Sequence, residues 1–119
     1  MLISIDFRDK RPLYEQVSDR LEELIIRGAI EPNEALPSVR ALAVELSINP
    51  NTVQKAYGAL EQKGLIYSVS GRGSFATDAA DILPQKREEF FGELKELVQR
   101  GETLGVTKEE MIGAINGSG

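Results

Sequence analysis

With 119 residues, 41% of them hydrophobic and 28% charged, the chain has the composition of a folded protein and the length of one small domain, or of a compact domain with a short appendage. It contains no Cys and no His, which excludes disulfide bonds, thiolate zinc sites and the commonest general base, and leaves most enzyme mechanisms without their usual groups. The net charge of −5 argues mildly against nucleic acid as a partner, because proteins that bind phosphate normally carry a basic face.

The first predicted element is an amphipathic helix between Pro12 and Gly28. Its apolar residues recur at helical spacing, and they are Leu13, Val17, Leu21, Leu24 and Ile25. Pro12 suits the first helical turn, because the N–H that it lacks would be unpaired there. Gly28 can end the helix in a left-handed conformation.

Two further helices follow, separated by a short turn. Ser38 is a good N-cap for the second helix. The inward-facing residues of that helix are Leu42, Ala43 and Leu46. Residues 47–49 form the turn, and Asn49 can cap a third helix that has Pro50 at its first position and ends at Gly64. The apolar stripe of the third helix is Val53, Ala56, Tyr57 and Leu60.

Two strand-like runs come next, "LIYSV" at 65–69 and "SFAT" at 74–77, with "SGRG" between them. The glycines of that loop permit the positive φ angles of a hairpin. The order of helix, helix, turn, helix and hairpin is the layout of a winged helix-turn-helix. We therefore predict a mainly α fold with a small β-hairpin, and we assign this domain to residues 1–77.

The character of the sequence changes at Asp78. Residues 1–77 hold 9 Lys and Arg against 10 Asp and Glu, and residues 78–119 hold 5 against 9, so the net charge divides into −1 and −4. We interpret "DAADILPQ" at 78–85 as a hinge before two short amphipathic helices, the second opened by the capping box "TKEE" at 107–110. Such short helices cannot form a core alone, so we expect 78–119 to be a dimerisation tail. The predicted dimer interface is Phe90, Phe91, Leu94, Leu97, Val98, Met111, Ile112 and Ile115.

Polar residues at the start of the third helix lie off its apolar stripe. They are Asn51, Thr52, Gln54 and Lys55. In a helix-turn-helix the second helix of the pair presents such residues to base edges in the major groove. Asn and Gln can pair with adenine, Thr can contact the thymine methyl, and Lys can bind guanine or phosphate. The alternative is an ordinary solvated surface with an asparagine cap.

Ser38, Arg40 and the loop "SGRG" are further candidates for contacts with DNA. Arg40 lies just after the Ser38 cap, where free N–H groups of the helix start attract anions, and it can clamp a phosphate. Gly71 and Gly73 let the backbone approach DNA, and Arg72 at the tip can enter a minor groove or clamp a phosphate. The alternatives are a solvated arginine and an ordinary hairpin turn. A nucleotide cradle is rejected, because no helix follows this glycine pair.

The tail offers two weaker alternatives. Phe90 and Phe91 can line a small-molecule pocket, but an aromatic and aliphatic stripe on a helix is more often core or interface. A cluster of four glutamates on the first tail helix can be interpreted as an acid–base or metal site, although charges on an exposed helix usually face water. The members of that cluster are Glu88, Glu89, Glu93 and Glu96. We assign them no chemistry, and we expect no cofactor and no metal.

Three segments together resemble the DNA-binding domain of the GntR family of bacterial transcription regulators. They are "PLYEQVSDRLEELIIRGAI", "LPSVRALAVELSINPNTVQKAYGALEQKGLI" and "SGRGSFAT". The segment "NPNTVQKAY" and the short tail resemble the YtrA-type subfamily. The resemblance covers about residues 10–77, and its motifs rarely coincide at these spacings otherwise.

The resemblance implies a winged helix-turn-helix, a homodimer joined through the C-terminal helices and an inverted-repeat operator. It also implies DNA contacts by the arginine of "PSxR", by the loop before the third helix with its first turn, and by the wing glycine. These positions are Arg40, Asn49, Asn51, Thr52, Gln54 and Gly71. Many relatives carry arginines where this chain has Pro50 and Gln54, so their base preference does not transfer. Kinship further implies a repressor, which can control a transporter operon.

We therefore predict a dimeric, cytoplasmic repressor that binds double-stranded DNA and is not an enzyme. No apolar run reaches the roughly 20 residues that span a bilayer, and the first residues lack the order of a signal peptide. The rival is a module that binds other proteins, because winged helices also do this and the tail is acidic. A small-molecule effector that wedges between tail and wing is a further hypothesis, motivated by the hinge at 78–85.

Overall fold

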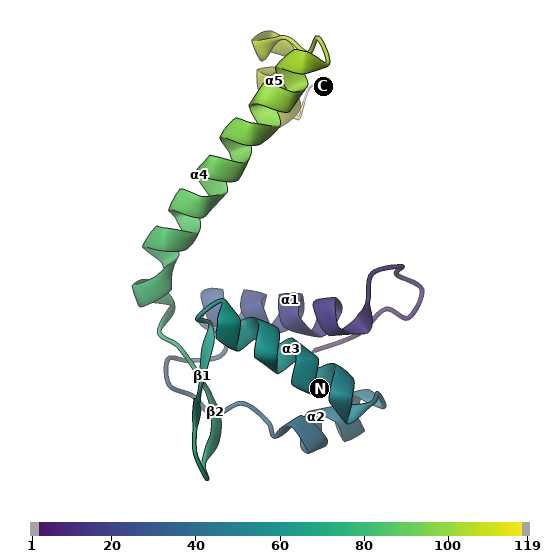
Figure 1. Cartoon of the computed structure of the whole chain (residues 1–119), viewed down its shortest axis with the longest axis vertical. Coiled ribbons are helices and arrows are strands. Elements are labelled where there is room, and N and C mark those ends of the chain that lie inside the picture. Colours follow the sequence, from purple (N-terminus) through teal and green to yellow (C-terminus); the bar gives the residue numbers. More distant parts are fainter. Residues whose placement is uncertain (1–2, 118–119) are drawn as a thin grey trace. The chain divides into compact units, whose positions relative to one another are not determined.

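The computed structural model describes residues 3–117, whose helices and strands are labelled in Figure 1. They are α1 (Leu13–Ile26), α2 (Val39–Leu46), α3 (Pro50–Gln62), β1 (Ile66–Val69), β2 (Gly73–Ala76), α4 (Ala79–Thr103) and α5 (Lys108–Ile115). The chain divides into two compact units, the first up to Leu83 and the second from Pro84. The predicted mainly helical fold, with one hairpin and two C-terminal helices, is confirmed.

Helix α1 starts one residue later than its sequence predicts. Pro12 has an extended ψ of 144° and is the N-cap residue rather than part of the first turn. The N–H groups of Glu15 and Gln16 both donate to the Pro12 carbonyl, so the helix begins after the proline. At the other end Gly28 takes a φ of +80°, which confirms the predicted left-handed stop.

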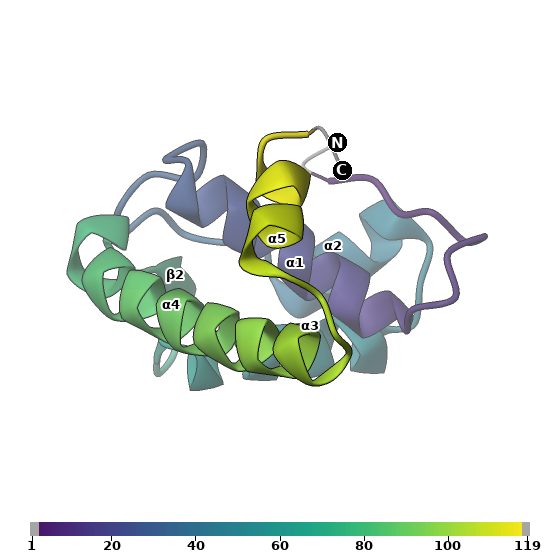
Figure 2. The same cartoon turned by 90° about the horizontal axis from the view of Figure 1, so that it is seen from above.

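The segment before α1 is tied back onto that helix. The Gln16 side chain is buried, accepts a hydrogen bond from the Asp6 N–H at 3.0 Å and donates one to the Asp6 carbonyl at 3.0 Å. Ile3 is buried in the core, and the segment runs out and back beside the beginning of α1 (Figure 2). A buried amide needs such partners, so Gln16 fixes the path of the chain here.

Local caps define both helices of the helix-turn-helix. The Ser38 Oγ accepts from the Ala41 N–H at 3.1 Å, and the Asn49 Oδ1 accepts from the Asn51 N–H at 2.8 Å. Between them Ser47 takes the left-handed conformation, with φ 57°, and ends α2. Pro50 opens α3 as predicted. The tight turn thus fixes the angle at which α3 leaves α2.

Helix α3 lies in the centre of the first unit, packed against both α1 and α2. The largest fully buried side chains are Val17, Leu21, Ile25, Leu42, Val53, Leu60 and Leu65. Burying each of these side chains contributes roughly 1.5–3 kcal/mol. The inward face of α3 is therefore held firmly, and its other face is left to solvent.

The hairpin is anchored to the loop before α2. Strands β1 and β2 are antiparallel, with Tyr67 opposite Phe75 and Val69 opposite Gly73. Ala35 forms a bridge with Phe75, and the Tyr67 hydroxyl donates to the Asn33 Oδ1 at 2.8 Å. These contacts hold the base of the wing and leave its tip free of the core.

The first C-terminal helix differs from the expectation. Residues 79–103 are helical, so the segment 78–85, which we expected to precede the helix as a hinge, forms the cap and the first turns of the helix itself, and α4 is 25 residues long rather than short. The Asp78 carboxylate accepts from the Ala80 N–H at 3.0 Å, and this cap, with the helix-forming residues that follow, outweighs Pro84. The unit boundary still falls at Pro84, which has no N–H for the carbonyl of Ala80. The effector hypothesis therefore stays a prediction.

The second unit buries no residue of α4 or α5. The capping box predicted for α5 is confirmed, because the Thr107 Oγ1 accepts from the Glu110 N–H and the Glu110 carboxylate accepts from the Thr107 N–H. The latter bond lowers the pKa of Glu110. Within residues 3–117, no helix is both long enough and apolar enough to cross a bilayer.

Candidate nucleic-acid interface

The start of α3 divides into a buried and an exposed face. Val53, Ala56, Tyr57 and Leu60 are at most 4% exposed. On the other face, Asn51, Gln54 and Lys55 are exposed and Thr52 is half-buried. The four polar candidates are thus free to meet a partner while the helix itself is fixed. Asn49 is exposed as well, but its Oδ1 is engaged as the helix cap, which leaves its Nδ2 as the free donor.

Arg40 lies exposed in the first turn of α2. Within residues 3–117 its guanidinium forms neither an ion pair nor a side-chain hydrogen bond. Ser38, which the sequence also placed at this site, is exposed, with its hydroxyl engaged by the Ala41 N–H. An unpaired arginine at a helix start is suited to a phosphate.

Tyr57 ties the start of α2 to α3. Its hydroxyl donates to the Pro37 carbonyl at 2.6 Å, and burial raises the pKa of Tyr57 to about 12. Pro37 directly precedes the Ser38 cap, so this bond sets the position of Arg40 relative to α3. The sequence placed Tyr57 only in the apolar stripe, because helical spacing gives no sign of a partner 20 residues away.

The wing presents its tip to solvent. Gly71 and Gly73 take φ angles of +76° and +102°, which residues with a side chain rarely adopt. Arg72 between them is exposed. The Arg72 N–H donates to the Val69 carbonyl at 2.9 Å and closes the turn. The guanidinium forms no ion pair in the described part of the chain, so it is available to a phosphate or a groove.

Charge is unevenly spread over the first unit. Between Ser38 and Ala56 the charged residues are Arg40, Glu45 and Lys55. Acidic side chains gather instead on α1, where Asp19 pairs with Arg11 at 2.7 Å and Glu22 pairs with Lys63 at 3.4 Å. Glu61 near the end of α3 makes α2 and α3 together neutral, so the negative total comes mainly from the rest of the chain, and the objection raised by the net charge is weakened.

Lys55 has a partner that its sequence does not reveal. Its Nζ lies 4.1 Å from the centre of the Tyr14 ring. Tyr14 comes from the first turn of α1, and no spacing rule relates it to a residue of α3. A shallow concavity here is lined by Pro12, Leu13, Tyr14, Asn51, Thr52 and Lys55. Among the described residues no cluster of carboxylates is placed to hold a metal ion.

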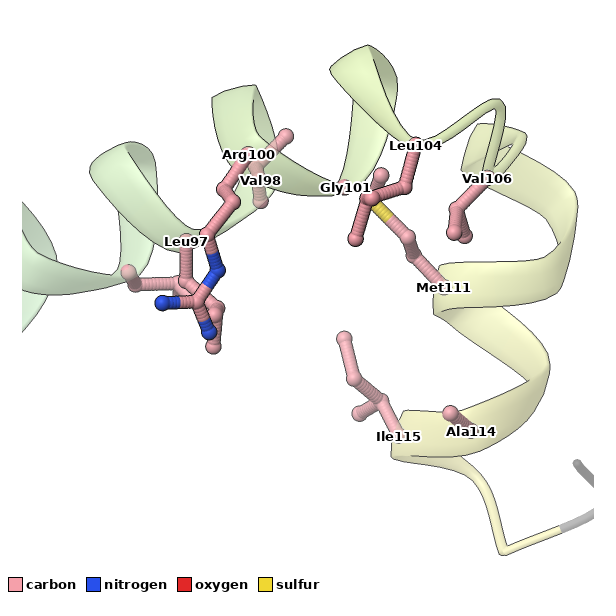
Figure 3. A pocket seen from close by; sticks show the side chains of 10 residues that line it. Leu97, Val98, Arg100, Gly101, Leu104, Val106, Met111, Ala114 and Ile115 are labelled. Carbon is pink, nitrogen blue, oxygen red and sulfur yellow. The ribbon is translucent and has the colours of Figure 1, made fainter.

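The second unit exposes its apolar residues. Phe90, Phe91, Leu97, Leu104, Ile112 and Ile115 are each more than half exposed. Leu94, Val98 and Met111 are half-buried. A groove of about 300 Å³ between the end of α4 and α5 is lined almost wholly by apolar side chains, with Arg100 at its edge (Figure 3). Of the predicted interface residues, Phe90, Phe91 and Ile112 lie outside the groove lining, and the others line it.

Two known proteins of nearly the same length are similar to this chain. The HTH-type transcriptional repressor YtrA of Bacillus subtilis (strain 168) is 38% identical over 112 residues, which are 92% of this chain and 86% of YtrA. The solved structure of a GntR family transcriptional regulator from Listeria monocytogenes matches with a TM-score of 0.72 and 33% identity, and covers 92% of this chain and 97% of the other. Neither protein is named as an enzyme.

Two further comparisons concern the first unit. The DNA-binding domain of AraR, solved in complex with operator ORE1, matches with a TM-score of 0.55 and 32% identity over 61% of this chain and 89% of that one. The family model of bacterial regulatory proteins, gntR family, matches residues 13–76, from the start of α1 to the end of β2. The chain therefore belongs to the gntR family and is a DNA-binding transcription regulator.

Proposed function

We propose that this regulator is a homodimeric repressor that binds an inverted-repeat operator, with one α3 helix in each of two major grooves. The observation that carries this proposal is the exposed polar start of α3 on a helix whose other face is fully buried. Asn51, Gln54 and Lys55 then meet base edges or phosphates without any rearrangement of the core.

Phosphate contacts fix the orientation of α3 on the duplex. Arg40 binds a phosphate beside the start of α2, with its position set by the bond from Tyr57 to Pro37. Arg72 binds in the adjacent minor groove or on its phosphates, because Gly71 and Gly73, which have no side chains, let the backbone of the tip approach DNA. Asn49, Thr52 and Gly71 complete the set of contacts that the sequence predicts.

Dimerisation places the two α3 helices on one duplex. The second unit has no buried residue in either helix and exposes aromatic and aliphatic side chains, so a second copy of the same unit is its simplest cover. Two-fold symmetry of the protein then requires a palindromic site. Repression is supported by the name of the relative YtrA, and control of a transporter operon rests on kinship alone.

The test is a selection of bound duplexes from a random pool by the full chain, followed by a salt titration on the selected site. We expect an inverted repeat and, for roughly 6–10 phosphate contacts per dimer, an affinity that falls by several powers of ten between about 50 and 200 mM salt. Failure to enrich any sequence, with no salt-sensitive complex, would favour the rival protein-binding module.

A further inference from the structure

A second helix contributes to the surface around the start of α3. Tyr14 lies in the first turn of α1, is half-buried and packs against the core of the first unit. The Nζ of Lys55 sits over its ring, 4.1 Å from the centre. No other contact of this kind is found among residues 3–117. The ring is fixed by the core on one side and offers its face to Lys55 on the other.

Nothing acidic competes with the ring for Lys55. Within the described chain Lys55 forms no ion pair, and the residues three and four positions away on α3 carry no charge. These residues are Asn51, Thr52, Gly58 and Ala59. The Lys55 ammonium is therefore held by an attraction that leaves its charge intact, whereas a carboxylate partner would neutralise it.

The geometry leaves the ammonium open to an anion. Lys55 is exposed and lies at the edge of the concavity shared by the starts of α1 and α3. An ammonium group has three N–H donors, and a ring face occupies only one side of it. A lysine that is already held loses less side-chain freedom on binding than a lysine that moves freely in solvent.

We propose that Tyr14 is a positioning residue for DNA binding, whose ring holds Lys55 ready to contact a backbone phosphate. The proposal rests on the proposed function, and it deepens that function by naming a group outside the helix-turn-helix. It assigns Lys55 to a phosphate rather than to a base edge. Lys55 should then strengthen binding to every sequence, and Tyr14 should act only through Lys55.

The experiment is a double-mutant cycle on the full chain, with affinity measured by fluorescence anisotropy on the selected duplex and on a scrambled one. Tyr14→Leu removes the ring and should weaken binding about five- to thirtyfold for a dimer that uses both copies. Tyr14→Phe keeps a ring and should bind nearly as the parent does. Lys55→Met should weaken binding to both duplexes and reduce the salt slope by about 0.9 for each phosphate that the protein no longer neutralises.

The decisive comparison is Tyr14→Leu in the Lys55→Met background. We expect no further loss of affinity there, because the ring has nothing left to hold. A loss of the same size as in the parent background would mean that Tyr14 acts on the fold alone, and the inference would be overturned. If Tyr14→Leu lowers the thermal midpoint, Tyr14→Met replaces it in the same cycle.

Arg40→Ala separates this inference from the proposed function. Arg40 lies on α2 and touches neither Tyr14 nor Lys55, so its loss should weaken binding whatever Tyr14 does. Weaker binding by Arg40→Ala, with parental binding by Tyr14→Leu, would overturn the role of Tyr14 alone. If the unaltered chain formed no salt-sensitive complex with any duplex, both proposals would fall.

Discussion

Buried hydrophobic side chains of the described structure all lie between Ile3 and Ala76, whereas α4 and α5 bury none. Both units are built of amphipathic helices and both contain helices with side-chain caps, so local sequence does not explain the difference. The first unit encloses α3 between α1 and α2, and its apolar stripe meets two partners. The second has only a pair of helices, and Ile115 and Leu104 remain 75% and 74% exposed. The first unit thus has a hydrophobic core of its own, whereas the helices of the second unit leave their apolar side chains largely exposed.

Leu60→Ala should break the first unit most severely. Leu60 is 0% exposed on the inward face of α3, so its removal leaves a cavity and lowers the free energy of unfolding by about 2–5 kcal/mol. Urea unfolding followed by circular dichroism measures this. Ile112→Ala, at a 57% exposed position of α5, is the control and should leave the unfolding of the first unit unchanged. An equal loss of unfolding free energy for the two variants would contradict the proposed difference between the units.

Tyr57 should make the first unit sensitive to alkali. Its pKa is raised by burial from 10.0 to about 12, so the folded state favours the neutral phenol. The stabilisation is present below pH 10 and is lost as pH rises from 10 to 12, a loss of roughly 3 kcal/mol. Unfolding measured at several pH values should show this loss, and Tyr57→Phe should not. An identical pH dependence for both proteins would exclude Tyr57 as its source.

Leu97→Glu should damage the second unit without unfolding the first. Leu97 is half exposed and lines the groove, so a charge there must be buried if two copies meet through this surface. We expect dimer affinity to fall by about 2 kcal/mol or more, roughly thirtyfold, in sedimentation equilibrium. Gln99→Glu adds the same charge at an exposed position outside the groove lining and should associate as the parent does. A dimer unaffected by Leu97→Glu would place the interface elsewhere.

Thr107→Ala should have the smallest effect and sharpen the comparison. Thr107 caps α5, and its loss should destabilise that helix by about 1 kcal/mol, which is large for a helix without buried residues. Hydrogen exchange of the α5 amides measures this, with Lys108→Ala as the control. Unchanged protection of these amides would show that packing against a partner, rather than the cap, fixes α5.

The elements that local chemistry controls were predictable from the sequence. Ser38, Asn49 and Thr107 are side-chain caps, and each sits where the spacing of polar and apolar residues predicts a helix start. The segment 78–85, in contrast, forms the cap and first turns of α4 rather than a hinge before the helix, because the Asp78 cap starts a helix that continues through Pro84. Pro84 removes the one backbone hydrogen bond to the Ala80 carbonyl, and the helix continues through it.

Contacts between distant segments could not be predicted from the sequence pattern. The bond from Tyr57 to Pro37 and the stacking of Lys55 on Tyr14 join residues whose separation follows no local period. Sequence pattern placed the polar residues on the exposed face of α3, but only the packed helices reveal which other side chains surround them. DNA contact by these residues therefore stays a prediction, and the structure adds which side chains surround them.

The central claim is that the exposed start of α3 recognises bases while Arg40 holds the backbone, and one binding measurement tests it directly. Arg40→Ala and Gln54→Ala are compared with the parent on the selected duplex and on a scrambled one. We predict that Arg40→Ala weakens binding to both duplexes alike, whereas Gln54→Ala lowers the preference for the selected sequence. Equal losses on both duplexes for both variants would contradict the account.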